Sequence, residues 1–322
     1  MVQDPCHNRV VARSAAAGFT LPFTMEQAAG RPFTLSTLPR LLRVNHWIKN
    51  GFVFFPAFFA TVILQPEVLW RTGAGFLCFS LGASAIYLYN DLRDVEQDRL
   101  HPEKRLRPIA AGEVPVAVVP WISALLAVAA MVGAWLTEPL FAWVLGTYLI
   151  MNLLYSARLK HIPIVDVAII ALGFNLRILA GGILARVPNS QWIYLITFLL
   201  ALFIALAKRR DDLVQADGGA GLRASLRGYN LQFVDAGMIM LAALTVQSYI
   251  LYTVSGEVTA RLQTDRLYMT SGFVVLGMLR YFQITLVEKR SGSPTKLVYS
   301  DRGLRLVLLG WIISLAVILY AR

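Results

Sequence analysis

Residues 73–98 read GAGFLCFSLGASAIYLYNDLRDVEQD. The part before Asn90 is almost wholly apolar, and acidic side chains begin where it ends. An apolar block of this length matches the hydrocarbon core of a bilayer, about 30 Å thick, which takes about 20 helical residues to cross. Backbone N–H and C=O groups in lipid must be paired within the segment. The stretch therefore predicts a transmembrane α-helix with an acidic end.

Similar blocks recur along the 322-residue chain, which is 57% hydrophobic and 15% charged. Soluble domains carry about 25% charged residues, and the alternation of a membrane β-barrel is not visible. We therefore predict an all-α integral membrane protein. A mobile N-terminal tail over residues 1–40 precedes a transmembrane domain over residues 41–322, whose nine helices lie near 47–64, 73–91, 115–136, 140–156, 164–185, 191–208, 234–254, 267–286 and 304–321.

The net charge of +11 would suggest nucleic-acid binding in a soluble protein. Here the basic residues lie at the ends of apolar blocks, where orientation in the membrane and anionic lipid explain them better, and we expect no nucleic-acid partner. Most of them fall in the loops after the second, fourth, sixth and eighth spans. The alternate loops hold only Arg71, Arg186, Arg261 and Arg266. The positive-inside rule thus predicts a multi-pass protein of the cell (inner) membrane, with its N-terminus and these four loops in the cytoplasm.

The acidic end of the second span has the spacing of a metal site. On a helix, Asn90, Asp94 and Asp98 share a face, and Asp91 lies three residues before Asp94. Carboxylates stacked on one face repel each other unless a cation lies among them. Oxygen ligands suit Mg²⁺ that bridges to substrate phosphates. We predict that Asp91, Asp94 and Asp98 bind Mg²⁺; the alternative is an ordinary solvated helix end.

Two basic loops could supply phosphate ligands. Lys104, Arg105 and Arg107 follow the acidic motif, and arginine offers paired donors to phosphate oxygens. In the loop after the fourth span, Lys160 can act as a point charge on a phosphate. Asp166 begins the next span, either as a helix cap or as a second metal or sugar ligand.

Further cations lie in or at the ends of spans. Arg177 is near the middle of the fifth span, where a charge costs on the order of 3 kcal/mol or more. It should face the bundle interior and meet an anion or an aspartate there. Lys208 and Arg209 end the sixth span. These two cations either orient the chain in the membrane or close over a phosphate.

These motifs resemble the UbiA-type prenyltransferase superfamily over residues 40–322. The pattern N-D-x-x-D-x-x-x-D matches Asn90, Asp91, Asp94 and Asp98, and a following R-x-R-P…G element matches residues 105–112. The resemblance implies nine helices around a central cavity. The second motif departs from the common forms D-x-x-x-D and Y-x-x-x-K, because Tyr155 and Lys160 are one residue further apart and Asp166 follows.

That departure, together with the segment from Asn45 to Asn50, resembles the branch of decaprenyl-phosphate phosphoribosyltransferases. The branch implies Mg²⁺-dependent transfer of 5-phosphoribosyl from phosphoribosyl pyrophosphate to a polyprenyl (decaprenyl) phosphate in membrane lipid, with release of pyrophosphate, for arabinan precursors of the cell envelope. The residues that it implicates are, as catalytic groups, Asp91, Asp94, Asp98 and Asp166, and, as substrate ligands, Asn90, Lys49, Lys104, Arg105, Arg107, Tyr155, Lys160, Arg177, Lys208 and Arg209.

The chemistry of such a donor is compatible with these residues. A lipid phosphate is already an anion and needs no general base, so catalysis would be positioning and electrostatics. The donor's 5-phosphate lies at the far end of the ribose from the diphosphate and requires a second, metal-free cationic pocket. The candidates are Lys160, Arg177, Lys208 and Arg209.

Two other functions and the oligomeric state stay open. The same acidic motif would serve ordinary transfer of a polyprenyl group from its diphosphate to an aromatic acceptor. A secondary transporter is a further alternative, but the acids lie at the edge of the membrane and no pair of matched half-helices is visible.

Overall fold

The computed structural model describes residues 34, 36–100, 103–215, 226, 228–288, 297 and 300–321, and these contain helices and no strand. Most of the tail predicted over residues 1–40 lies outside them, and its last residues enter α1. The helices are α1 (Thr37–Leu41), η2 (Val44–Phe54), α2 (Phe55–Phe59), α3 (Pro66–Arg93), α4 (Val95–Leu100), η3 (Lys104–Leu106), α5 (Val119–Thr137), α6 (Pro139–Ala157), η4 (Leu159–His161), α7 (Val165–Ala185), α8 (Gln191–Gln215), α9 (Leu231–Val254), α10 (Gly256–Leu262), η7 (Arg266–Thr270), α11 (Ser271–Phe282), η8 (Gln283–Val287) and α13 (Arg302–Tyr320).

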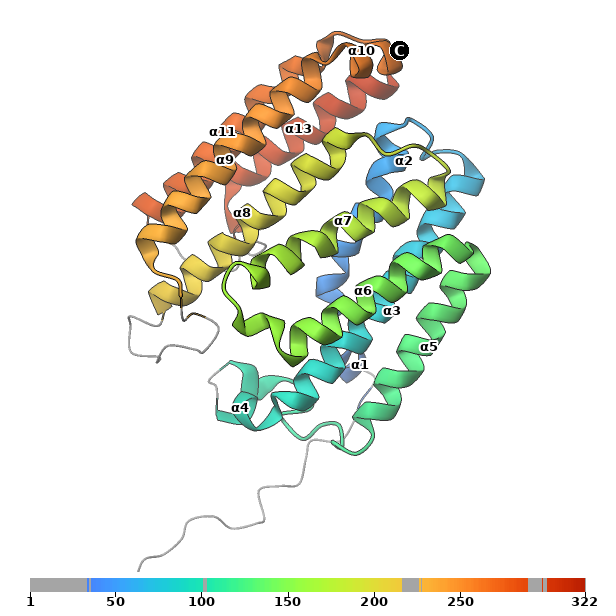
Figure 1. Ribbon diagram of the computed structural model, residues 1–322, viewed down its shortest axis with the longest axis vertical. Helices are drawn as coiled ribbons and strands as arrows, with labels where there is room; N and C mark the ends of the chain where they lie inside the picture. The colour runs from blue at the N-terminus through green and yellow to red at the C-terminus, as the bar shows by residue number, and fades with distance from the viewer. Residues whose placement is uncertain are drawn as a thin grey trace, which may run out of the picture.

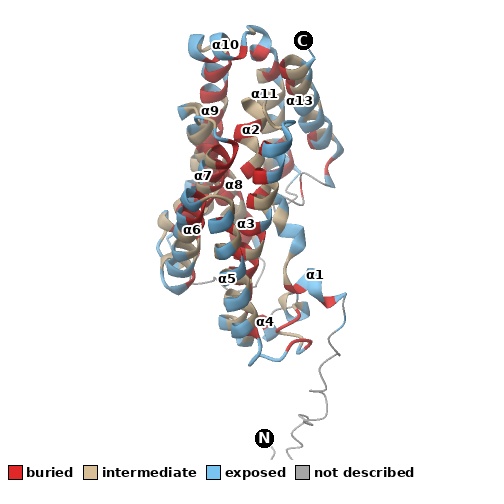
Figure 2. Ribbon diagram, turned by 90° about the vertical axis from the view of Figure 1, so that its right-hand side faces the viewer, coloured by how far each residue is buried: buried red, intermediate tan, exposed pale blue. Residues whose placement is uncertain are grey.

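Eight helical stretches of the described residues are long and apolar enough to cross a membrane. They correspond to the second to ninth predicted spans, and the prediction of an all-α membrane protein is confirmed. Large apolar side chains such as Trp121, Leu136 and Trp143 are exposed on their outer faces. Figure 2 shows exposed residues along α5 and α13 and buried ones toward the middle of the bundle. Outward apolar side chains suit a lipid surrounding rather than water.

The first predicted span, 47–64, is not one continuous α-helix. A 3₁₀ segment, η2, leads into the short helix α2, whose first turn contains Pro56. At a rise of about 2.0 Å per residue for the first and about 1.5 Å for the second, the two together extend about 30 Å, close to the thickness of the hydrocarbon core. The nine-helix count therefore stays a prediction, with eight spans found.

This η2–α2 segment packs against α3 and α7 on the inner side of the bundle (Figure 1). The approach to α7 is close because a β-carbon on Gly181 would lie 2.2 Å from the carbonyl oxygen of Val53. Two buried clusters lie within the bundle, and the first of them includes Val53 of this segment. One lies around Phe79 and Phe141, and the other around Phe203 and Met238. The short helices α1 and α4 lie at one end of the bundle, and α10 lies with the C-terminus at the other (Figure 1).

Candidate active site

The acidic motif lies where α3 gives way to α4. Helix α3 ends at Arg93, Asp94 leaves the helical conformation with φ −97° and ψ 7°, and α4 begins at Val95. This differs from the single helical face expected for Asn90, Asp94 and Asp98. Instead, Asp91 and Asp98 meet one guanidinium. Nη1 of Arg107 lies 3.0 Å from Oδ1 of Asp91 and 2.5 Å from Oδ2 of Asp98.

A second arginine, Arg43, completes this cluster, and the sequence reasoning missed it. It donates to Asp91, and its guanidinium lies 4.9 Å from the ring centre of Tyr87. The backbone of Arg43 is left-handed, with φ 51°, a conformation that few non-glycine residues adopt. Lys104 adds a third cation, 3.7 Å from Oδ1 of Asp98. Because Asp91 and Asp98 are buried, these cations offset the cost of burying two carboxylates.

The donor set of the motif suits Mg²⁺ in its chemistry, since it offers three carboxylates at one helix junction. No group of three acidic, histidine or cysteine side chains in the described part of the chain is already close enough to hold a metal ion. Basic side chains lie among the carboxylates instead. A metal that arrived with a diphosphate would fit if Arg107 moved from the carboxylates to the phosphate oxygens.

The two loops that the sequence singled out do meet. Nζ of Lys160 lies 3.5 Å from Oδ1 of Asp94, and both side chains are about one-third exposed, at 28% and 35%. This ion pair joins the loop after α6 to the junction of α3 and α4. Asn90 is half-buried, and Arg105 is exposed with no ion-pair partner among the described residues.

Asp166 is fully buried. Its side chain makes no helix-capping hydrogen bond, so the cap interpretation is wrong. Oδ1 accepts from the hydroxyl of Tyr229 at 2.5 Å, and Oδ2 accepts from Nε of Arg209 at 2.7 Å. Tyr229 also accepts from the backbone N–H of Ile164, a residue with φ 69°. Burial, reinforced by the bond to Asp166, raises the pKa of Tyr229 to about 12.

Two aspartates to which the sequence analysis gave no role lie near the C-terminal end of α8. Asp211 and Asp212 are buried. Lys208 lies 3.3 Å from the first and 2.9 Å from the second, and Arg209 lies 3.3 Å from Asp212. Tyr155, near the end of α6, is half-buried, and the positive charge of Arg209 acts on it. The signal for these residues was present, since two acids directly follow a basic run at a span end.

Arg177 faces the bundle interior, as expected, but its partners are neutral. It donates to the side-chain oxygen of Asn50 at 2.8 Å, to the carbonyl of Gly173 at 2.7 Å and to the hydroxyl of Tyr148 at 3.0 Å. The aspartate partner considered from the sequence is not found among the described residues. Lys49 lies next to Asn50 in the chain, is half-buried, and makes no hydrogen bond or ion pair within the described part.

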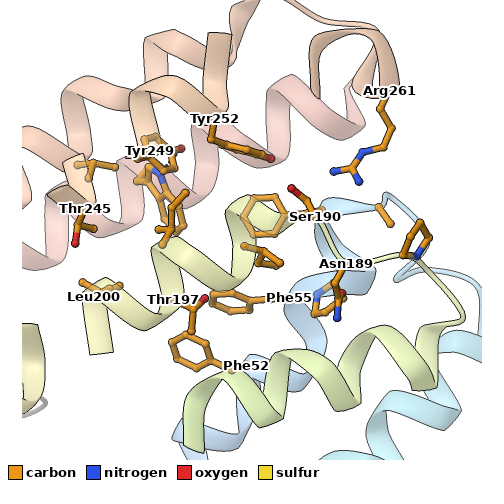
Figure 3. A pocket seen from close by; sticks show the side chains of 18 of the residues that line it. Phe52, Phe55, Asn189, Ser190, Thr197, Leu200, Thr245, Tyr249, Tyr252 and Arg261 are labelled. Carbon is orange, nitrogen blue, oxygen red and sulfur yellow. Dashed lines mark hydrogen bonds between the residues drawn. The ribbon is translucent and has the colours of Figure 1, made fainter. Parts of the chain in front are cut away.

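An apolar cavity opens on the other side of η2 and α2 (Figure 3). It has a volume of about 150 Å³ and is lined mainly by aromatic and aliphatic side chains, among them Phe52, Phe55, Tyr249, Tyr252 and Trp311. The ring of Phe52 packs edge-on against that of Phe174, 5.0 Å between centres, and Phe174 lies 5.6 Å from the guanidinium of Arg177. Two aromatic rings therefore separate the apolar cavity from Arg177.

Residues 53–309 match the model of the UbiA prenyltransferase family. The chain belongs to this family. It is 34% identical over 307 residues to the decaprenyl-phosphate phosphoribosyltransferase of Mycolicibacterium smegmatis. This match covers 92% of this chain and 96% of that protein. It is also 34% identical over 289 residues to the protein of the same name from Corynebacterium glutamicum, covering 87% and 86%. The sequence resemblance to this family and branch is thereby confirmed.

A solved UbiA homolog from Archaeoglobus fulgidus, bound to DMAPP and Mg²⁺, has a similar fold. The TM-score is 0.65 at 20% identity, and the match covers 88% of this chain and 99% of that one. At this identity the similarity establishes the fold alone. It agrees with the UbiA-like helical bundle expected from the motifs.

Proposed function

We propose that this protein transfers the 5-phosphoribosyl group of phosphoribosyl pyrophosphate to a polyprenyl phosphate and releases pyrophosphate. The observation that carries the proposal is the 34% sequence identity to two decaprenyl-phosphate phosphoribosyltransferases, which extends over 92% and 87% of the chain. The geometry supports it, because the acidic and basic side chains of two loops meet at one end of the bundle through Lys160 and Asp94. By the same likeness, the product would be a precursor of arabinan in the cell envelope.

The diphosphate of the donor would bind at the junction of α3 and α4. Asp91, Asp94 and Asp98 would hold Mg²⁺, which neutralises charge that builds up on the leaving pyrophosphate. Arg107 and Lys160 already lie beside these carboxylates, at 3.0 Å from Asp91 and 3.5 Å from Asp94, and would donate to phosphate oxygens. The exposed Arg105 and the neighbouring Lys104 would add positive charge at the mouth.

The reaction needs positioning rather than proton transfer. An oxygen of the lipid phosphate forms a bond to the anomeric carbon of the ribose, and the bond from that carbon to the pyrophosphate oxygen breaks. The nucleophile is already an anion, so no side chain has to remove a proton. Preorganised charges supply the stabilisation. Asp166 would act on this step indirectly, because its carboxylate fixes Arg209 and Tyr229 and has no exposed surface.

The apolar cavity beside η2 and α2 would hold part of the acceptor's polyprenyl chain. Its lining is almost entirely apolar, and the aromatic pair Phe52–Phe174 lies between it and Arg177. Such a pocket offers an isoprenoid chain apolar contacts in place of those with lipid tails.

Ordinary prenyl transfer is the second candidate, because the chain belongs to the UbiA prenyltransferase family and the acidic motif would serve both reactions. The two differ in the diphosphate consumed. Purified protein with Mg²⁺ should release pyrophosphate from phosphoribosyl pyrophosphate only when a polyprenyl phosphate is present. Pyrophosphate release from a polyprenyl diphosphate with an aromatic acceptor, and none from phosphoribosyl pyrophosphate, would favour prenyl transfer.

We also propose that the end of the bundle with α4 faces the cytoplasm. Residues 91–114 and 208–233 should be cytoplasmic and residues 255–266 external, although 101–102, 216–225 and 227 lie outside the described part. The distribution of basic residues supports this orientation. In intact cells, a membrane-impermeant thiol reagent should label a cysteine at exposed Gln263 and spare one at exposed Arg105. Labelling of the cysteine at position 105 alone would indicate the opposite orientation.

A further inference from the structure

The turn between η4 and α7 has an unusual backbone. Ile164, just before α7, has φ 69° and ψ −47°, and the N–H of Val165 donates to the carbonyl of Pro163 at 2.8 Å. A hydrogen bond across three residues with these angles is a γ-turn of the positive-φ form, which is rare and strained. Positive φ is least favourable for a β-branched residue such as isoleucine. Such a conformation persists only where surrounding contacts hold it.

The hydroxyl of Tyr229 supplies such a contact. It accepts from the N–H of Ile164 at 2.6 Å and donates to Oδ1 of Asp166 at 2.5 Å. The first bond holds the central residue of the turn, and the second holds the start of α7. The side chain of Ile164 is 61% exposed, so its own packing does little to hold the turn. One hydroxyl therefore joins the strained turn to the segment that leads into α9.

The segment before α9 is shaped for this contact. Gly228 has φ 96°, and a β-carbon there would lie 2.6 Å from Cγ of Pro163. Glycine alone combines this backbone angle with so close an approach. On the other side of Tyr229, the side-chain oxygen of Asn230 accepts from the N–H of Phe233 at 2.7 Å and caps α9. Both neighbours of Tyr229 thus fix its backbone, and its hydroxyl meets the turn from a defined position.

Lys160 depends on the same turn. It lies in η4, four residues before Ile164, and its ammonium is 3.5 Å from Oδ1 of Asp94. The carbonyl of Ile162, at the end of η4, accepts from the N–H of Asp166 at 3.1 Å. Because η4 is tied in this way to the start of α7, a change in the turn would move η4 and carry Lys160 away from the acidic motif.

We propose that Tyr229 is a positioning residue whose hydroxyl holds the strained turn at Ile164 and thereby keeps Lys160 at the diphosphate site. The inference rests on the proposed function, in which Lys160 donates to phosphate oxygens of the donor. Without the hydroxyl, the turn relaxes and the ammonium leaves the place where it meets the diphosphate.

Hydrogen exchange tests the contact without any substrate. Tyr229→Phe keeps the aromatic ring and removes both hydrogen bonds. In the full-length protein in detergent, deuterium exchange in a peptide that covers residues 160–166 should become about tenfold faster, as expected for the loss of a hydrogen bond that holds the turn closed. Tyr268→Phe removes an exposed hydroxyl in η7 and should leave exchange in that peptide unchanged.

Steady-state kinetics test the link to Lys160. Tyr229→Phe should raise the KM for phosphoribosyl pyrophosphate about tenfold and change the KM for polyprenyl phosphate less than about twofold. In a Lys160→Met background no ammonium is left to position, so the same substitution should raise the donor KM less than about twofold further. A loss of stability alone would instead add to the effect of Lys160→Met.

A second substitution should restore the turn by another route. Glycine adopts positive φ without strain, so Ile164→Gly lets the turn persist when the hydroxyl is absent. The double variant with Ile164→Gly and Tyr229→Phe should recover most of the donor affinity that Tyr229→Phe alone loses, with Ile164→Gly alone as the reference. Failure to recover it would overturn the role of strain at Ile164.

Three further results separate the possible failures. Wild-type exchange and a wild-type donor KM in Tyr229→Phe would overturn the proposed contact. Faster exchange with a KM effect that is additive with Lys160→Met would overturn the positioning role. Faster exchange in a protein that consumes polyprenyl diphosphate and leaves phosphoribosyl pyrophosphate untouched would uphold the role of Tyr229 in holding the turn and refute the proposed function.

Discussion

Replacing Asp94 by asparagine should reduce turnover on the order of a hundredfold or more, because loss of a metal-binding carboxylate removes several kcal/mol of charge stabilisation. The protein should still fold, since the Asp94 side chain is 35% exposed and its ion pair with Lys160 is also partly exposed. Exposed pairs of this kind contribute about 0–1 kcal/mol to stability. The loss should therefore appear in kcat and in the dependence on Mg²⁺.

A matched control lies two residues further along the chain. Glu96 is an exposed acid on α4 that pairs with Arg99, and Glu96→Gln should keep near-normal turnover. Activity would be measured across a range of Mg²⁺ concentrations, with thermal unfolding in detergent as the check on folding. Near-normal turnover in Asp94→Asn, or full wild-type turnover in excess chelator, would contradict the assignment of Asp94 as a Mg²⁺ ligand.

The second large effect concerns stability rather than turnover. Arg107 contacts two buried carboxylates, so Arg107→Ala leaves Asp91 and Asp98 with less compensation. Breaking a buried ion pair from one side costs about 3–5 kcal/mol. Arg43 and Lys104 remain nearby, so we expect the lower end of that range. Added Mg²⁺ should restore part of the loss, because the metal would take the place of the missing cation.

Arg105→Ala provides the comparison, since Arg105 comes from the same loop and is exposed without an ion-pair partner in the described part of the chain. Thermal unfolding of both variants, with and without Mg²⁺, is the measurement. If Arg107→Ala unfolds at the same temperature as Arg105→Ala, Arg107 does not hold the acidic cluster together.

The sequence was sufficient for the parts of the fold that depend on local composition. An apolar block long enough to cross a bilayer forces a helix, because lipid offers no hydrogen-bond partners. The predicted limits of the fifth span, 164–185, accordingly fall within one residue of α7. The first span is different. Its 3₁₀ conformation accompanies close packing against Gly181 of α7, a tertiary contact that no local pattern reports.

The site was predictable in its residue types but not in its pairings. The acidic motif and the basic loops are visible as short patterns, yet Arg43 reaches Asp91 across 48 residues and Tyr229 reaches Asp166 across 63. Such contacts depend on how the helices pack. The same limit explains why Lys160 and Lys49 looked alike as cations in the sequence. Lys160 has a carboxylate partner, whereas Lys49 has no ion pair among the described residues.

The most direct test of the proposed function follows the atoms of the donor. Purified protein, Mg²⁺ and polyprenyl phosphate would be incubated with phosphoribosyl pyrophosphate that is labelled with ¹⁴C in the ribose and with ³²P in the 5-phosphate. The lipid product should carry both labels in the ratio of the donor, with one unlabelled pyrophosphate released for each lipid formed. The proposed function would be contradicted if the lipid fraction stayed unlabelled while the same preparation prenylated an aromatic acceptor with polyprenyl diphosphate.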